Sequence, residues 1–289
     1  MKYYIYEYVK LKSLASFGYY MYRIIMVVPT IWLAQVNAAP TLTFLNEHLP
    51  YIRGTRKRIP SGVAHERFMV DSEAQIANER KSLLARCGLA PATPDTACII
   101  LMVQRLAPEK GTMRCLEALS EIPRKAGEPL SLDGVRPLHL VIAGDGPSRK
   151  HLEQFAATHA LPVTFAGNLP NGDLPPLYRA ADLFVTCSTS ETFGLTVLES
   201  LACGTPAVLP HCGVFDELWM TRIPNEWIYD EGTKGSLLAS LRHAGARTSK
   251  AYLVKNPVRR HAPSCTMVPR GGIFPLAPPS PSPPLVCGR

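Results

Sequence analysis

The segment ADLFVTCSTSETFGLTVLESLACGTPAV, residues 181–208, constrains the fold more than any other part of the chain. An apolar run that predicts a strand is followed by a turn, TFG, and then by a helical pattern. Glu191 falls on the loop at the carboxyl end of the predicted strand, and Glu199 falls about one turn into the predicted helix. Free backbone N–H groups and the positive end of a helix dipole therefore lie between two carboxylates. Such a site suits an anion that is flanked by hydroxyl groups.

Strand and helix patterns alternate along the chain from residue 71 to about residue 245. The strand patterns are continuous apolar runs, which are typical of parallel sheets with both faces covered. They are TACIILMV, RPLHLVIAG, LPVTFAG, DLFVTCS, TPAVLP and EWIY. This alternation predicts an α/β fold, a Rossmann-like parallel sheet with helices on both faces. Ligands of such sheets bind outside the carboxyl ends of the strands.

The 289 residues are enough for one large domain or two small ones, and they carry a formal net charge of +8. The positive charges are dispersed apart from RGTRKR at residues 53–58, a pattern that suits acidic ligands or a membrane surface. No zinc-finger or aromatic–basic motif indicates nucleic acid as a partner. We interpret the cysteines as reduced thiols in a cytoplasmic protein or at a cytosol- or stroma-facing membrane surface. They are Cys87, Cys98, Cys115, Cys187, Cys203, Cys212, Cys265 and Cys287.

The two ends of the chain differ from the middle. Residues 14–34 are apolar with Arg23 as their one charge, so they predict either a membrane-spanning helix or a helix that is soluble or lies on a membrane surface. Arg23 and Pro29 favour the second interpretation. The Pro- and Ser-rich residues 251–289 predict a disordered or polyproline-like tail.

The Glu191–Glu199 segment resembles the E-x7-E motif of the retaining, metal-independent glycosyltransferases of family 4 (group 1), which have the GT-B fold. The match S-E-T-F-G-L-x-x-L-E-x-x-x-x-G-x-P-x-V keeps all the spacings of that motif. The resemblance implies a nucleotide-sugar donor, UDP- or GDP-linked, bound as a substrate with no resident cofactor and no metal site. It also implies that Glu199 accepts hydrogen bonds from the ribose and that Glu191 lies near the transferred sugar. The backbone of Phe193, Gly194 and Leu195 is expected to meet the sugar or the diphosphate.

Three further segments resemble the same family in the same order. VQRLAPEKGT matches the G-R-x4-K-G segment with Gln104 in place of glycine, and it implies that Arg105 and Lys110 hold the diphosphate. Because negative charge grows on the leaving diphosphate, fixed cations stabilise it when no metal does. In LVIAGDGP, Gly144 is expected to allow close backbone approach. In VTFAGNLP, the family implies that the nucleobase lies along Gly167, Asn168 and Leu169. The predicted catalytic residues are Glu191, Arg105 and Lys110.

The resemblance covers about residues 59–244, the donor-binding half of a GT-B enzyme, and divides the chain into three parts. The resemblance implies that residues 1–70 are a remnant of the N-terminal domain with the interdomain linker, where Ala64 replaces the usual Asp of the turn. Residues 71–250 form the nucleotide-sugar domain, and residues 251–289 form the tail. The predicted function is transfer of a hexosyl group with retention to a hydroxyl acceptor, a glycolipid being one option. The alternative is a truncated, non-catalytic nucleotide-sugar-binding module.

Overall fold

The computed structural model describes residues 22, 25–26, 29–48, 53–64, 66–86, 97–124 and 127–247. The predicted tail at residues 251–289 and most of residues 14–34 lie outside this part of the chain, so the expectations for them stay predictions. Among the described residues, no helix is both long enough and apolar enough to span a bilayer.

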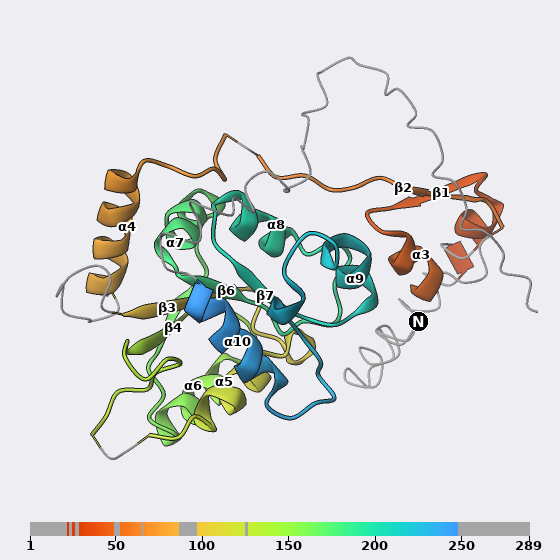
Figure 1. Ribbon diagram of the computed structural model, residues 1–289. Helices are drawn as coiled ribbons and strands as arrows, with labels where there is room; N and C mark the ends of the chain where they lie inside the picture. Colours follow the sequence, from red (N-terminus) through yellow and green to blue (C-terminus); the bar gives the residue numbers. More distant parts are fainter. Residues whose placement is uncertain are drawn as a thin grey trace, which may run out of the picture.

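Six parallel strands form the central sheet, in the order β5-β4-β3-β6-β7-β8 (Figure 1). Every residue of the two long central strands, β3 and β4, is buried, as the continuous apolar runs predicted. The predicted parallel α/β sheet is therefore confirmed. The strands are β3 (Cys98–Val103), β4 (Leu138–Ala143), β5 (Val163–Gly167), β6 (Leu183–Val185), β7 (Ala207–Pro210) and β8 (Ile228–Tyr229).

Helices cover both faces of the sheet (Figure 1). On one face lie α4 (Glu73–Arg86), α7 (Leu174–Ala180), α8 (Leu195–Ala202) and α9 (Gly213–Trp219). On the other face lie α5 (Thr112–Ser120), α6 (Arg149–Thr158) and α10 (Ser236–Arg247). Short 3-10 turns, η1 (Pro108–Lys110), η2 (Asn171–Asp173) and η3 (Asn225–Trp227), precede α5, α7 and β8. The hydrophobic core consists of buried apolar side chains between the sheet and these two layers of helices.

A separate strand–helix–strand unit precedes the main sheet. It consists of β1 (Val36–Ala39), α3 (Leu42–His48) and β2 (Thr55–Arg58), and its two strands pair in parallel. The residue pattern by itself marks neither strand. Each strand has only four residues, and β2 is Thr-Arg-Lys-Arg with all four side chains exposed, so no apolar pattern marks it.

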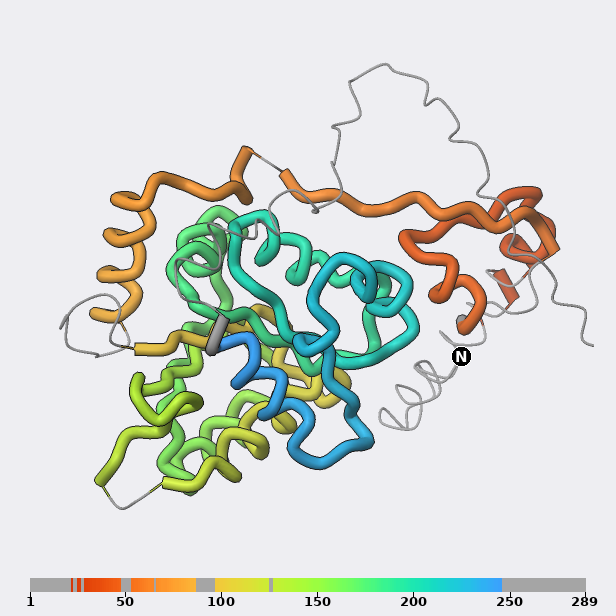
Figure 2. The backbone as a smooth tube through the Cα atoms, in the orientation of Figure 1, coloured from red at the N-terminus to blue at the C-terminus, as the bar shows by residue number. Residues whose placement is uncertain are grey.

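The linker after β2 runs along the main domain to α4 (Figure 2). Its turn forms although Ala64 replaces the usual Asp, because the N–H groups of Arg67 and Phe68 both donate to the Ala64 carbonyl oxygen, at 2.9 and 3.0 Å. Phe68 is 2% exposed, and its ring lies edge-on to Tyr178 with centroids 6.1 Å apart. The aromatic side chain thus anchors the linker in the core.

The N-terminal unit docks on the main domain through the start of α3. Thr41 is fully buried and donates its hydroxyl hydrogen to the Thr192 carbonyl oxygen at 3.2 Å. The Glu217 carboxylate on α9 accepts the N–H groups of Leu42 and Thr43 at 3.1 and 2.8 Å. Two of the N–H groups that a helix start leaves without an internal partner are therefore satisfied by the other unit.

Glu217→Gln should loosen this contact in a pH-dependent way. Burial raises the pKa of Glu217, but the hydrogen bonds from Thr43 and Leu42 outweigh it, so the folded pKa lies below the ordinary value. The stabilisation is then complete above the unfolded pKa of about 4.3 and is lost as the pH falls through the folded pKa. We expect amide hydrogen exchange in α3 to report a loss of about 1 kcal/mol at pH 7 that shrinks as the pH falls through the folded pKa. The charge-matched control is exposed Glu66→Gln, and a loss that persists at low pH would contradict the prediction.

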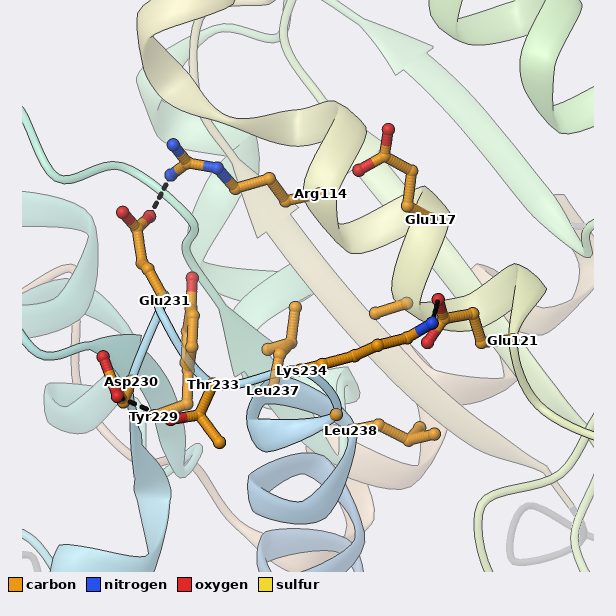
Figure 3. A pocket seen from close by; sticks show the side chains of 12 residues that line it. Arg114, Glu117, Glu121, Tyr229, Asp230, Glu231, Thr233, Lys234, Leu237 and Leu238 are labelled. Carbon is orange, nitrogen blue, oxygen red and sulfur yellow. Dashed lines mark hydrogen bonds and ion pairs between the residues drawn. The ribbon is translucent and has the colours of Figure 1, made fainter.

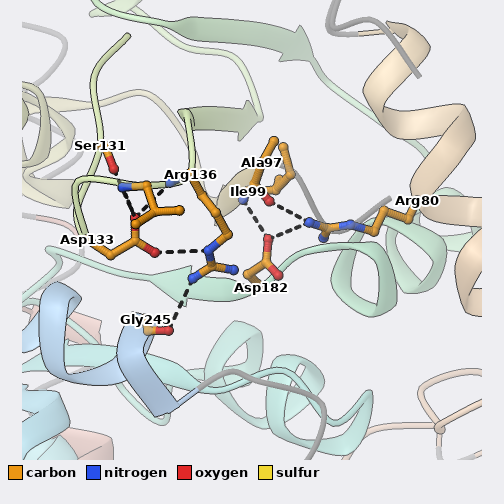
Figure 4. A network of polar contacts seen from close by, with 9 residues as sticks. Arg80, Ala97, Ile99, Ser131, Asp133, Arg136, Asp182 and Gly245 are labelled. Carbon is orange, nitrogen blue, oxygen red and sulfur yellow. Dashed lines mark hydrogen bonds and ion pairs between the residues drawn. The ribbon is translucent and has the colours of Figure 1, made fainter. Parts of the chain in front are cut away.

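An arginine–aspartate pair ties α4 to the sheet (Figure 4). Arg80 donates to Asp182 at 2.9 Å and to the carbonyl oxygens of Ala180 and Ala97 at 2.7 and 2.6 Å. The same Asp182 oxygen accepts the N–H of Ile99 at 2.7 Å. In this network one carboxylate joins α4, β3 and the start of β6, so Asp182 has a structural role.

Asp182→Ala should destabilise the main domain by about 3–5 kcal/mol, because it leaves the Arg80 charge buried without its partner. Urea unfolding followed by circular dichroism measures the change. Asp173→Asn is the control, since Asp173 is exposed and its side chain caps no helix. It should stay within about 0.5 kcal/mol of the unsubstituted protein. Similar unfolding midpoints for the two variants would refute the structural role of Asp182.

Candidate functional site

The predicted site residues follow four neighbouring strands at the carboxyl edge of the sheet. Arg105 and Lys110 follow β3, Gly144 follows β4, and residues 167–169 end or follow β5. The Glu191 loop and α8 follow β6. Because β5, β4, β3 and β6 are consecutive in the sheet, residues that are far apart in the sequence share one edge.

The direction in which the chain adds strands to the sheet reverses between β3 and β6. After β3 the chain adds β4 and β5 on one side, and it then returns to place β6 on the other side. Such a reversal is where ligands bind in open α/β sheets. Here Lys110, after β3, lies with its Nζ 2.6 Å from Oε1 of Glu191, after β6. The structure thus joins two predicted site residues that are 81 positions apart.

Arg105 pairs with a carboxylate that the sequence analysis did not single out. Its guanidinium bonds to Oε1 of Glu109, within the same loop. The Arg105 side chain is 56% exposed, and the Glu109 side chain is 21% exposed. The only sequence signal for Glu109 was its place in APEKG, next to Lys110. Each of the two predicted cations therefore faces one acid.

The loops of the site touch at backbone level. A Cβ at Gly144, where φ is +141°, would lie 2.0 Å from the carbonyl oxygen of Gln104. At Gly111, where φ is +66°, it would lie 2.4 Å from the carbonyl oxygen of Cys187. Gln104 stands where the family has glycine, and its side chain donates to the Lys110 carbonyl oxygen at 3.1 Å and to Thr112 at 2.8 Å. It therefore braces the loop that carries the two cations.

Glu199 is held by Tyr178, whose hydroxyl donates to Oε2 of Glu199 at 2.8 Å. Burial raises the pKa of Glu199, and the hydrogen bond from Tyr178 acts in the opposite direction. Burial and the neighbouring carboxylate raise the pKa of Tyr178, so its hydroxyl keeps its proton. Tyr178 is fully buried, so its ring also packs in the core. The second oxygen of Glu199 is left for another donor.

Residues 167–169 are linked to the rest of this edge of the sheet through the main chain. The N–H of Gly144 donates to the carbonyl oxygen of Gly167 at 2.7 Å. Asn168 is exposed and Leu169 is half-buried. Within the part of the chain that the structure describes, no hydrogen bond or ion pair joins Asn168 or Leu169 to Glu191 or Lys110.

A hollow of about 250 Å³ lies between α5, the end of β8 and the start of α10 (Figure 3). Lys234 reaches across to Glu121 at 3.1 Å, and Arg114 pairs with Glu231. None of the predicted donor residues lines this hollow, so it is separate from the candidate site.

Comparison with known proteins identifies the family. Residues 90–243, more than half of the chain, match the family described as glycosyl transferases group 1. The chain belongs to the group 1 glycosyltransferase family. It is 31% identical over 160 residues to alpha-monoglucosyldiacylglycerol synthase of Streptococcus pneumoniae, covering 54% of this chain and 33% of that protein. It is 37% identical over 128 residues to the GDP-mannose-dependent alpha-(1-6)-phosphatidylinositol dimannoside mannosyltransferase of Mycobacterium tuberculosis, covering 44% and 30%.

Solved structures share the fold of this glycosyltransferase. Sucrose-phosphate synthase from Thermosynechococcus elongatus superposes with a TM-score of 0.64 at 21% identity, over 84% of this chain and 57% of that one. HepE from Anabaena, in complex with UDP and glucose, gives a TM-score of 0.60 at 19% identity, over 82% and 61%. The glycosyltransferase spans about a third of the length of the curated relatives it matches.

The start of α8 also depends on a glycine in this glycosyltransferase. Gly194 has φ +77°, and no side chain caps the helix that follows. A Cβ at Gly194 would lie 2.5 Å from Cε1 of Phe215, a residue that is 1% exposed and packed in the core. The adjacent Phe193 is buried and Leu195 is exposed. Gly194 therefore allows α8 to begin close against α9.

Gly194→Ala should destabilise the protein by about 1–3 kcal/mol, because the left-handed backbone and the contact with Phe215 both oppose a methyl group. Chemical denaturation measures the change. Gly172→Ala is the matched control, since a Cβ there meets nothing within 4 Å. It should stay within about 0.5 kcal/mol of the original protein. Equal losses in the two variants would argue against the close packing at Gly194.

Proposed function

We propose that the carboxyl edge of the sheet holds a nucleotide-sugar donor and that the chain transfers its hexosyl group to a hydroxyl acceptor. The observation that carries the proposal is the meeting of Lys110 and Glu191 at 2.6 Å across the β3–β6 reversal. A cation and an acid at that place can contact a phosphate on one side and a sugar hydroxyl on the other. The donor is a substrate, UDP- or GDP-linked, and no resident cofactor is invoked.

Each residue has a defined role in this proposal. Arg105 presents a planar fork to phosphate oxygens, and Lys110 supplies a compact charge. As the bond between sugar and phosphate breaks, both cations stabilise the charge on the leaving diphosphate without a metal ion. Glu199 accepts hydrogen bonds from ribose hydroxyls with the oxygen that Tyr178 leaves free. Glu191 faces the sugar, which is transferred to the acceptor hydroxyl with retention of its anomeric configuration.

The nucleobase lies along Gly167, Asn168 and Leu169 in this proposal, at the end of β5. The uncapped start of α8, with the backbone of Phe193, Gly194 and Leu195, directs N–H groups toward the sugar or the diphosphate. Gly144 brings the main chain after β4 close to the cation loop. The co-structure of HepE with UDP and glucose supports a nucleotide-linked hexose as the ligand class.

The acceptor is proposed to be a lipid-linked hydroxyl at a cytosol-facing membrane surface. Relatives named for glucosyldiacylglycerol and for phosphatidylinositol mannoside support this class of acceptor. In the part of the chain that precedes β1, Ile25, Met26 and Leu33 are 62%, 53% and 70% exposed. The four residues of β2, three of them basic, are exposed as well. Apolar side chains together with cations suit peripheral binding to anionic lipid.

Arg105→Gln and Lys110→Gln should each weaken binding of UDP or GDP about tenfold or more, because each removes a charge-assisted hydrogen bond to phosphate. Binding of uridine or guanosine should not change. Isothermal titration calorimetry measures both, and Lys234→Gln, with a side chain 85% exposed at the separate hollow, is the control.

Equal losses for nucleosides and for diphosphates would show that these cations do not touch phosphate. Transfer itself is measured with UDP-glucose or GDP-mannose and a lipid acceptor, and the anomeric proton coupling of the product distinguishes retention from inversion.

A further inference from the structure

Both cations of the candidate site are neutralised by the protein's own carboxylates. Lys110 pairs with Glu191, and Arg105 pairs with Glu109. Glu191 is expected to face the sugar, so any change there alters two interactions at once. Glu109 has no assigned contact with the donor, and its effect on Arg105 can be measured alone.

A carboxylate and a phosphate present the same feature to an arginine, a pair of oxygens that accept hydrogen bonds from the planar guanidinium. Glu109 binds Nη2 of Arg105, so a ligand phosphate that binds the guanidinium through a pair of donors that includes Nη2 must displace Glu109 from that nitrogen. Resting on the proposed function, we propose that Glu109 is a specificity-determining residue that competes with the ligand's diphosphate for Arg105 and thereby lowers its affinity.

The loop keeps Glu109 in reach of Arg105. Glu109 lies in η1, where the N–H of Lys110 donates to the Ala107 carbonyl oxygen at 3.0 Å and that of Gly111 donates to the Pro108 carbonyl oxygen at 3.2 Å. The backbone on both sides of the acid is therefore fixed. The acid returns to Arg105 whenever the ligand leaves, so the competition also favours release of the nucleoside diphosphate that transfer produces.

The size of the effect follows from the exposure of the pair. Arg105 is 56% exposed, and exposed ion pairs of this kind shift an equilibrium by about two- to five-fold. Glu109→Gln should therefore bind UDP, GDP and inorganic pyrophosphate about two- to five-fold more tightly than the unsubstituted protein. Binding of uridine and guanosine should not change, because they carry no phosphate.

Calorimetry on the full chain tests the proposal with four further variants. Glu109→Asp keeps the charge but shortens the side chain, so it should also gain affinity if contact with Arg105 matters. Glu121→Gln removes an equal charge at the far end of α5, where Glu121 pairs with Lys234, and should have no effect. In the Arg105→Gln background, adding Glu109→Gln should change nothing, because the competition acts through Arg105.

The outcomes separate this inference from the proposed function. If the unsubstituted protein binds diphosphates and Glu109→Gln binds them equally, the inference fails and the function stands. If Glu109→Gln gains affinity but Glu109→Asp does not, or the gain persists without Arg105, the effect is general charge and the inference fails. If neither protein binds UDP, GDP or pyrophosphate, both are overturned.

Discussion

The ion pair between Lys110 and Glu191 is the contact on which the rest of the site depends. It forms because the chain reverses direction in the sheet between β3 and β6, so that loops 81 positions apart emerge side by side. Both side chains are about one-fifth exposed, which strengthens the attraction relative to bulk water. The Arg80–Asp182 network joins the same two strands at their opposite ends. Ion pairs thus hold β3 and β6 together at both ends of the two strands.

Close backbone contact gives these charges a rigid frame. Gly111 and Gly144 let the cation loop pack against the ends of β6 and β4 at distances that a side chain would forbid. Gln104 closes the loop from within through its bonds to Lys110 and Thr112. A site whose charged groups are held before the ligand arrives spends little free energy on reorganisation. The glycine-to-glutamine departure from the family is therefore compatible with an ordered cation loop.

The sequence predicted the sheet, its helices and the strand ends that carry the site, because long apolar runs and glycine turns are local signals. No local residue pattern marks β1 or β2, whose four-residue strands carry no apolar alternation. Glu109 and the contact of Thr41 with Thr192, which spans 151 positions, were also missed from the sequence. Such partners depend on where the fold brings the segments together, and no local pattern encodes that distance. The roles of the site residues in binding stay predictions.

The distribution of charge follows from these pairs. The chain has a net charge of +8, yet both cations of the candidate site are matched by acids before any ligand binds. The long-range positive field therefore arises elsewhere, including the exposed strand β2 in the N-terminal unit. Thr41 holds that unit to the loop that carries Glu191, and Glu217 holds it to α9. The exposed basic strand β2 and the paired cations of the candidate site are thus separate in this protein, and hydrogen bonds at the start of α3 hold the two parts together.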